Sequence, residues 1–182
     1  MARSAIERAP ALDAESAEAR GSDAGFRFRL GWDYTGAVAS ARRAIALNSN
    51  PALAHFYLAH TLSNSGEHTE ALECCSNARM SSGGNTEALS IAGHVHAASG
   101  ERAEAEQKIH EFLARRREHY VPPYNVALVF AGLGDLDSAL HWLQLAFADR
   151  DVHMNFLRDH KWNVLRSRPE FRALLKRVGL PE

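Results

Sequence analysis

The chain has 182 residues, of which 46% are hydrophobic and 24% charged, so its composition is that of a folded protein rather than a disordered or collagen-like one. It contains 21 Lys and Arg against 22 Asp and Glu, which gives a formal net charge of −1. Nucleic-acid-binding proteins typically carry a basic excess, and this chain has none. We therefore expect no nucleic-acid partner.

The N-terminus carries charge at Arg3 and Glu7 before any apolar run forms, unlike a secretory signal. No segment approaches the roughly 18 to 20 apolar residues of a membrane span. Cys74 and Cys75 are adjacent on an expected helix, where a disulfide between them would be strained. We expect a soluble protein of the reducing cytoplasm, with no membrane partner.

Residues 1–17 contain short apolar stretches that would suit a helix, but Pro10 interrupts them. We expect a partial or frayed helix there. An internal repeat follows, because four alanines lie 34 residues apart and three of them have a glycine five residues earlier. The alanines are Ala37, Ala71, Ala105 and Ala139, and the glycines are Gly66, Gly100 and Gly134, with Trp32 in the first glycine position.

Small or apolar residues recur four and seven positions after each alanine, which places these columns on one helical face. Further small residues lie twelve positions before each alanine, at Gly25, Ala59, Gly93 and Ala127. The pattern in each 34-residue copy thus predicts two helices that pack closely against each other. The alanines and glycines are expected to serve repeat packing, and Gly66 is expected to end the first helix of the second copy in a left-handed conformation.

The sequence resembles the tetratricopeptide repeat family, whose period is about 34 residues. The second copy matches its signature columns best, with Ala59, Leu62, Gly66, Ala71, Cys75 and Ala78. The family's tryptophan column departs from the pattern, because Gly21, His55, Leu89 and Pro123 stand there. The resemblance implies an all-α fold, a right-handed superhelical array of antiparallel helix pairs with C-terminal capping helices. It implies repeats at 18–51, 52–85, 86–119 and 120–153, and a capping segment at 154–182.

Helix boundaries can be expected along this array. Asn50 is expected to cap the second repeat and Pro51 to begin it. Residues 81–85 are expected to separate the second and third repeats, and Pro122 and Pro123 to start the fourth. We expect the basic run at 115–117 to lie at a helix C-terminus, where its positive charges interact favourably with the helix dipole. The alternative is that it contacts an anionic partner.

In the tail, Ser167 to Glu170 form a capping box with a proline in the first turn, and Gly179 and Pro181 end the predicted helix. This helix presents Phe171, Leu174, Leu175 and Val178 on one face. The tail is also similar to the C-terminal ends of repeat regions attached to bacterial nucleotide cyclases and winged-helix regulators. The residues that carry this similarity are Phe156, Leu157, Trp162, Leu165, Arg166, Ser167, Pro169, Phe171, Leu174, Leu175, Gly179 and Leu180.

Catalytic chemistry is not predicted. The ten histidines lack the spacings of zinc sites, so we expect no metal and no cofactor. Cys75 lies in a core column, and Cys74 is expected to be more exposed, with nothing nearby to lower its pKa. We therefore expect no catalytic residues.

By resemblance to the family, a partner would dock on the concave face formed by the first helices. The larger candidates there are Phe26, Arg29, Phe56, His60, Asn64, His94 and Tyr124. Phe26 and Phe56 could instead pack against neighbouring helices. The family's carboxylate clamp is absent, because its columns carry Ser22, Phe56, Ser90 and Tyr124, then Phe26, His60, His94 and Leu128.

The sequence therefore predicts a non-enzymatic protein–protein interaction scaffold that binds a peptide or protein partner in this groove. The alternative is a detached regulatory or sensor region of a bacterial signalling protein, acting in trans on a nucleotide cyclase or transcriptional regulator. A third reading is an enzyme that uses the histidine-rich groove. The partner's identity, its affinity, the oligomeric state and whether the chain is a fragment of a longer protein are all left open by the sequence.

Overall fold

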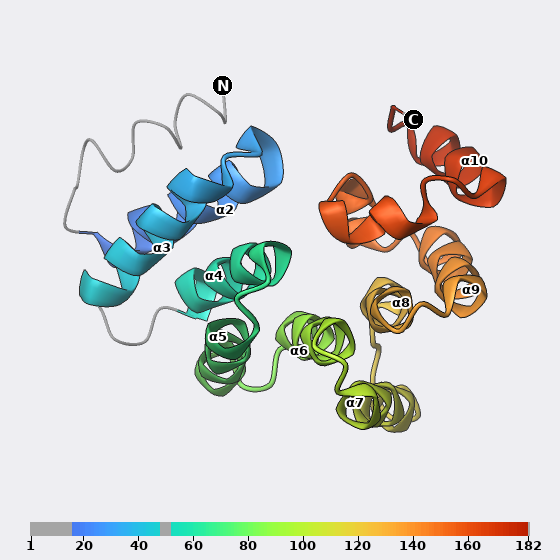
Figure 1. Ribbon diagram of the computed structural model, residues 1–182, viewed down its shortest axis with the longest axis horizontal. Helices are drawn as coiled ribbons and strands as arrows, with labels where there is room; N and C mark the ends of the chain where they lie inside the picture. Colours follow the sequence, from blue (N-terminus) through green and yellow to red (C-terminus); the bar gives the residue numbers. More distant parts are fainter. Residues whose placement is uncertain (1–15, 48–51, 182) are drawn as a thin grey trace. The chain divides into compact units, whose positions relative to one another are not determined.

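The computed structural model describes residues 16–47 and 52–181, and every regular element within them is a helix (Figure 1). The elements are α2 (Ala17–Phe26), η1 (Arg27–Gly31), α3 (Tyr34–Leu47), α4 (Ala52–Ser65), α5 (His68–Ser81), α6 (Thr86–Ala98), α7 (Arg102–Arg115), α8 (Pro123–Gly132), α9 (Leu136–Ala148), η2 (Val152–Phe156), η3 (His160–Leu165) and α10 (Pro169–Val178). η1 is a π-helix, and η2 and η3 are 3-10 helices. The partial helix predicted over 1–17 lies outside the described residues except at its last two positions, and the Asn50-Pro51 start lies wholly outside them.

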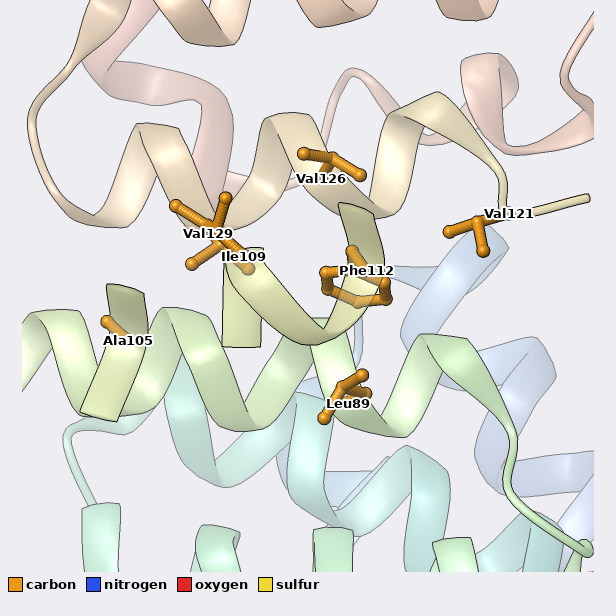
Figure 2. Close-up of a cluster of buried hydrophobic side chains, with 7 residues drawn as sticks. All are labelled: Leu89, Ala105, Ile109, Phe112, Val121, Val126 and Val129. Carbon is orange, nitrogen blue, oxygen red and sulfur yellow. The ribbon is translucent and has the colours of Figure 1, made fainter. Parts of the chain in front are cut away.

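The helices pack in sequence as pairs, which confirms the all-α prediction. α2 packs on α3, α4 on α5, and α8 on α9. The chain divides into two compact units, residues 1–88 and 89–182, and each is described by itself below. Within the second unit, Leu89 of α6 and Phe112 of α7 belong to one buried cluster, so these two helices also pack together (Figure 2).

The second helices of the four pairs begin 34 residues apart, at Tyr34, His68, Arg102 and Leu136. The alanine column lies three residues into each of them, and none of its four members is more than 1% exposed. The columns four and seven residues later are buried as well. Because an alanine side chain is short, each of these helices can approach its neighbours closely along this face.

Left-handed glycines end three of the first helices, and at Gly66 this confirms the prediction. Gly66, Gly100 and Gly134 have φ of +82°, +84° and +76°, which glycine adopts without steric cost. Trp32 takes the same role in the first pair with φ +53°. A side chain there is strained, and the preceding turn of the chain is the π-helix η1.

In the first unit, the buried carboxylate of Asp23 ties α2 to α3. It accepts a hydrogen bond from the hydroxyl of Ser40 and another, of 2.8 Å, from Nε of Arg27. Arg27 also contacts Asp33 at 2.7 Å, in the turn that leads into α3. The hydrogen bonds and ion pairs satisfy a charge that burial would otherwise penalise.

In the second unit, a hydrophobic cluster joins three successive helices, as Figure 2 shows. Ile109 and Phe112 come from α7, and Val126 and Val129 from α8. Phe112 is fully buried. The two helices are therefore held by apolar contact over two turns, in addition to the contact of α7 with α6.

The C-terminal segment adds one more pair of helical elements to the second unit. η3 packs on α8, and α10 packs on α9. α10 runs parallel to α9, because Arg168 before α10 contacts Asp137 at the start of α9, while Arg177 at its end lies over Phe147 at the end of α9. The tail therefore follows the same succession of pairs, with its apolar side chains buried.

The predicted boundaries of α10 are confirmed in part. Pro169 occupies the first turn, and Gly179 ends the helix with φ +82°. The predicted capping box is wrong. The residue in the capping position is Arg168, which makes no side-chain capping hydrogen bond, so Ser167 lies one residue too early to cap the helix.

Candidate functional site

The candidate binding residues lie on the first helices of the pairs and divide between the two units. Five belong to the first unit and two to the second. Those of the first unit are Phe26, Arg29, Phe56, His60 and Asn64, and those of the second are His94 and Tyr124.

Three of the five in the first unit come together. The guanidinium carbon of Arg29 lies 5.8 Å from the ring centre of Phe56, whose ring stands edge-on to His60 at 4.7 Å. His60 also contacts the ring of Phe28 at 4.9 Å. Phe26 is buried, and Asn64 lies half-buried at the C-terminal end of α4.

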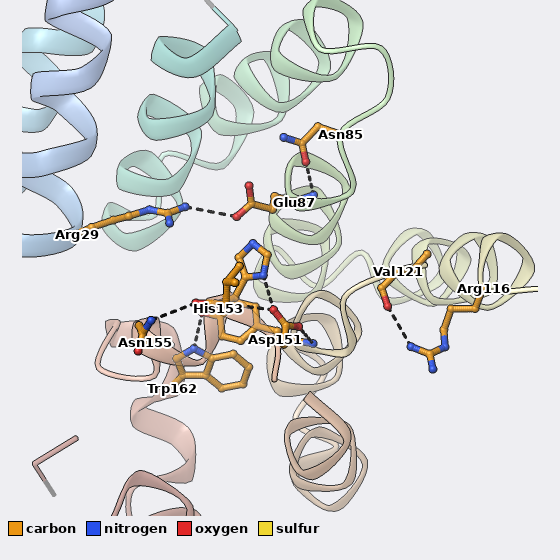
Figure 3. A network of polar contacts seen from close by, with 11 residues as sticks. Arg29, Asn85, Glu87, Arg116, Val121, Asp151, His153, Asn155 and Trp162 are labelled. Atoms are coloured by element: carbon orange, nitrogen blue, oxygen red, sulfur yellow. Dashed lines mark hydrogen bonds and ion pairs between the residues drawn. The ribbon is translucent and has the colours of Figure 1, made fainter. Parts of the chain in front are cut away.

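Two further residues, Tyr57 and Glu87, complete this group. The guanidinium of Arg29 lies 5.2 Å from the ring centre of Tyr57, and its Nη2 is 3.4 Å from a carboxylate oxygen of Glu87 (Figure 3). We call Phe28, Arg29, Phe56, Tyr57, His60 and Glu87 the Arg29 cluster. It combines a cation held over aromatic faces with an ion pair, so the orientation of Arg29 is fixed from two sides.

Burial separates the members of the Arg29 cluster by role. Phe56 is 4% exposed and His60 9% exposed, so these rings pack in the interior. For Phe56, this favours the alternative that its ring packs against neighbouring helices. Tyr57, Arg29 and Glu87 are half-buried. A ligand can therefore reach the polar end of the cluster, while its aromatic base is already covered.

Burial raises the pKa of the Tyr57 hydroxyl, the positive charge of Arg29 opposes this, and the negative charge of Glu87 adds to it. Tyr57 therefore stays protonated through the neutral pH range and can donate as well as accept a hydrogen bond. Together with the five N–H donors of Arg29, this gives the cluster directional polar groups beside apolar rings.

Sequence patterning missed Tyr57 and Glu87 for different reasons. Tyr57 follows Phe56 directly, and its direction on α4 depends on the packing of α2. Gly25 of α2 leaves the room for it, because a Cβ there would overlap the Tyr57 ring. Glu87 is 58 positions from Arg29, and no local pattern predicts an ion pair over that distance.

In the second unit, Tyr124 has a structural role. It is 6% exposed, its hydroxyl accepts a 2.9 Å hydrogen bond from Nε1 of Trp162, and its ring stacks on His153 at 5.5 Å. Tyr124 therefore holds the tail to α8.

The other candidate of this unit, His94, lies against α8, since a Cβ at Gly132 would come within 2.9 Å of its Nδ1.

Asp151 supports the same attachment. Its buried carboxylate accepts hydrogen bonds from the backbone amide of Tyr124 at 3.1 Å and from Nδ1 of His153 at 2.6 Å. Burial by itself would raise the pKa of Asp151, but the hydrogen bonds from His153 and Tyr124 outweigh burial and lower it. Asp151 thus caps the first turn of α8, where Pro122 supplies no side-chain acceptor.

Both thiols are buried. Cys74 is 5% exposed and Cys75 3%, so Cys74 is the more exposed of the two only by a small margin. Its desolvation, with Glu70 and Glu73 nearby, raises its pKa to about 11. A thiol with this pKa is protonated at neutral pH and is a poor nucleophile.

The basic run at the end of α7 is engaged within the second unit. Arg115 contacts Glu111 at 3.0 Å, and Arg116 donates to the carbonyl of Val121 at 3.0 Å while lying 5.0 Å over Trp142. These contacts favour the structural interpretation of the run. They add to the favourable position of the cations at a helix C-terminus.

Within residues 16–47 and 52–181, no group of three or more His, Cys, Asp or Glu is arranged to hold a metal ion. No helix in the same ranges combines the length and apolar character needed to cross a membrane. No protein-family model matches the chain, and no curated protein matches it.

Proposed function

We propose that this protein is a non-enzymatic scaffold that binds a peptide or protein partner, with its helix pairs arranged in a right-handed superhelix as in tetratricopeptide repeats. The 34-residue spacing of the second helices and the burial of the alanine column support the arrangement. Stacked helix pairs use the surface of their first helices for binding.

The Arg29 cluster is the observation that carries this proposal. It lies on η1, α4 and the first turn of α6, which are the first helices of three successive pairs. Its half-buried polar end presents a cation, a carboxylate and a phenol. Such a mixture suits a peptide that supplies hydrogen-bonding groups together with an apolar side chain.

The orientation of Arg29 lowers the entropic cost of binding. A free arginine side chain loses rotamer freedom when a ligand immobilises it, at about 0.5 to 1.5 kcal/mol. Arg29 is already positioned by the Tyr57 and Phe56 rings and by Glu87. A partner that hydrogen-bonds to Arg29 therefore meets a group that is ordered before binding.

The test is site-specific photo-crosslinking in the native cell, with a benzoylphenylalanine in place of Tyr57. The matched control carries the same residue in place of Glu73, which is exposed on α5. We expect a discrete crosslinked protein from position 57 and none of the same mass from position 73. Equal crosslinking from both positions, or none from position 57, would contradict the proposal.

A further inference from the structure

The charges of the chain are unevenly distributed: its net charge is close to zero, but its C-terminal segment is basic. Residues 154–182 contain seven Lys and Arg but three Asp and Glu, a net charge of +4, whereas residues 1–153 contain 14 against 19, a net charge of −5. The segment that attaches to α8 and α9 thus carries charge of opposite sign to the rest of the chain.

Much of this charge lies on one helix. α10 buries Phe171, Leu174 and Leu175 within the second unit. Arg172 and Lys176, one helical turn apart, are exposed on the other side, and Arg177 is exposed beside them. We call these three residues the basic face. The guanidinium of Arg177 lies 4.2 Å from the ring centre of Phe147. This contact positions one of the three cations of the basic face.

The basic face differs from several other arginines of the chain that are paired with carboxylates. Arg27, Arg42, Arg102 and Arg168 each have a carboxylate oxygen within 2.6 to 2.9 Å. In the part of the chain that the structure describes, neither Arg172 nor Lys176 forms an ion pair. A terminal helix needs a polar outer face for solubility, but charges of mixed sign would meet that need equally well.

We propose that the basic face of α10 binds a short acidic segment of a partner protein. α10 has ten residues and is about 15 Å long, which matches a few successive acidic side chains. A longer polyanion, such as duplex DNA or an anionic membrane, would also meet the exposed carboxylates of Asp137 and Glu170, which lie beside Arg168 at the start of α10. Charge complementarity therefore favours a short acidic peptide. This proposal does not depend on the Arg29 cluster.

The probe is a fluorescein-labelled octaglutamate peptide, titrated with the full chain and followed by fluorescence anisotropy. The test variant is Arg172→Gln/Lys176→Gln. The matched control is Arg102→Gln/Arg117→Gln, which removes the same charge from two other exposed positions. Thermal melts establish that both variants fold. A short DNA duplex and phosphatidylserine vesicles are titrated in parallel at about 20 mM and 150 mM salt.

We expect the wild type to bind the peptide at the lower salt concentration, and the test variant to bind it at least about fivefold more weakly, since the variant loses two of the three cations that pair with the peptide. The control variant should remain within about twofold of the wild type. Failure of the wild type to bind, an equal loss in the control, or tighter binding of duplex or vesicles than of peptide would each overturn the proposal.

Discussion

The indole Nε1 of Trp162 donates a 2.9 Å hydrogen bond to the hydroxyl of Tyr124, and both side chains are buried. The two rings also meet edge to face, with their centres 5.2 Å apart. This contact joins η3 of the tail to α8. The C-terminal segment is therefore part of the folded core of the second unit.

Trp162→Phe is expected to lower the free energy of unfolding by about 1 to 3 kcal/mol, because it removes the hydrogen-bond donor and part of a fully buried ring. Urea denaturation measures the loss. Val164→Ala, on the same 3-10 helix but 49% exposed, should change stability by less than about 0.5 kcal/mol. Similar losses in the two variants would show that the tail does not pack as described.

The lowered pKa of Asp151 predicts an acid-dependent loss of stability. Its pKa is lower in the folded than in the unfolded chain, so its contribution is present above the unfolded value of about 3.9 and is lost as pH falls through the folded value. Asp151→Asn should destabilise the protein at pH 7. The difference from wild type should shrink below about pH 4 in denaturation curves. A difference that does not change with pH would contradict this assignment.

Ala71→Leu is expected to destabilise the protein by about 1 to 3 kcal/mol, since Ala71 is fully buried where α5 packs closely. Glu73→Leu introduces the same side chain two residues further along α5, at an exposed position. Its effect should stay within about 0.5 kcal/mol. Thermal melts of the two variants compare them directly, and equal effects would mean that the predicted helical face is wrong.

Two helical glycines should respond oppositely to alanine. A Cβ at Gly21 would have its nearest neighbour at 3.7 Å, so Gly21→Ala should raise stability by about 0.5 to 1 kcal/mol through helix propensity. A Cβ at Gly93 would lie 2.7 Å from a methyl of Val129, so Gly93→Ala should lower it by about 1 to 3 kcal/mol. Calorimetry of both variants checks the signs, and a rise for Gly93→Ala would contradict the close approach of α6 and α8.

The helix pairs could be predicted from the sequence because their determinants are local. An alanine at a fixed interval marks the face where a helix is approached closely, and a glycine five residues earlier marks the end of the preceding helix. Gly66 adopts the left-handed conformation that this pattern predicts, and Ala71 is fully buried. Even Trp32, which departs from the pattern, is left-handed, since its position in the turn requires that conformation.

The candidate site was less predictable because its contacts are not local. The column positions correctly placed Arg29, Phe56 and His60 on first helices of the first unit, but they could not tell a buried ring from an exposed one. Glu87 reaches Arg29 from 58 positions away, and Asp151 caps a helix that begins 28 positions before it. Such contacts depend on how the helices pack, which a periodic pattern does not specify.

The central claim is that a partner segment binds at Arg29, and it is tested most directly by titration calorimetry of the segment recovered by crosslinking at position 57. Arg29→Gln is compared with Arg42→Gln, whose arginine is exposed and paired with Glu70. We predict that Arg29→Gln weakens binding by about tenfold or more, as loss of a central arginine does, while Arg42→Gln changes it by less than about twofold. Equal affinities of the two variants would contradict the claim.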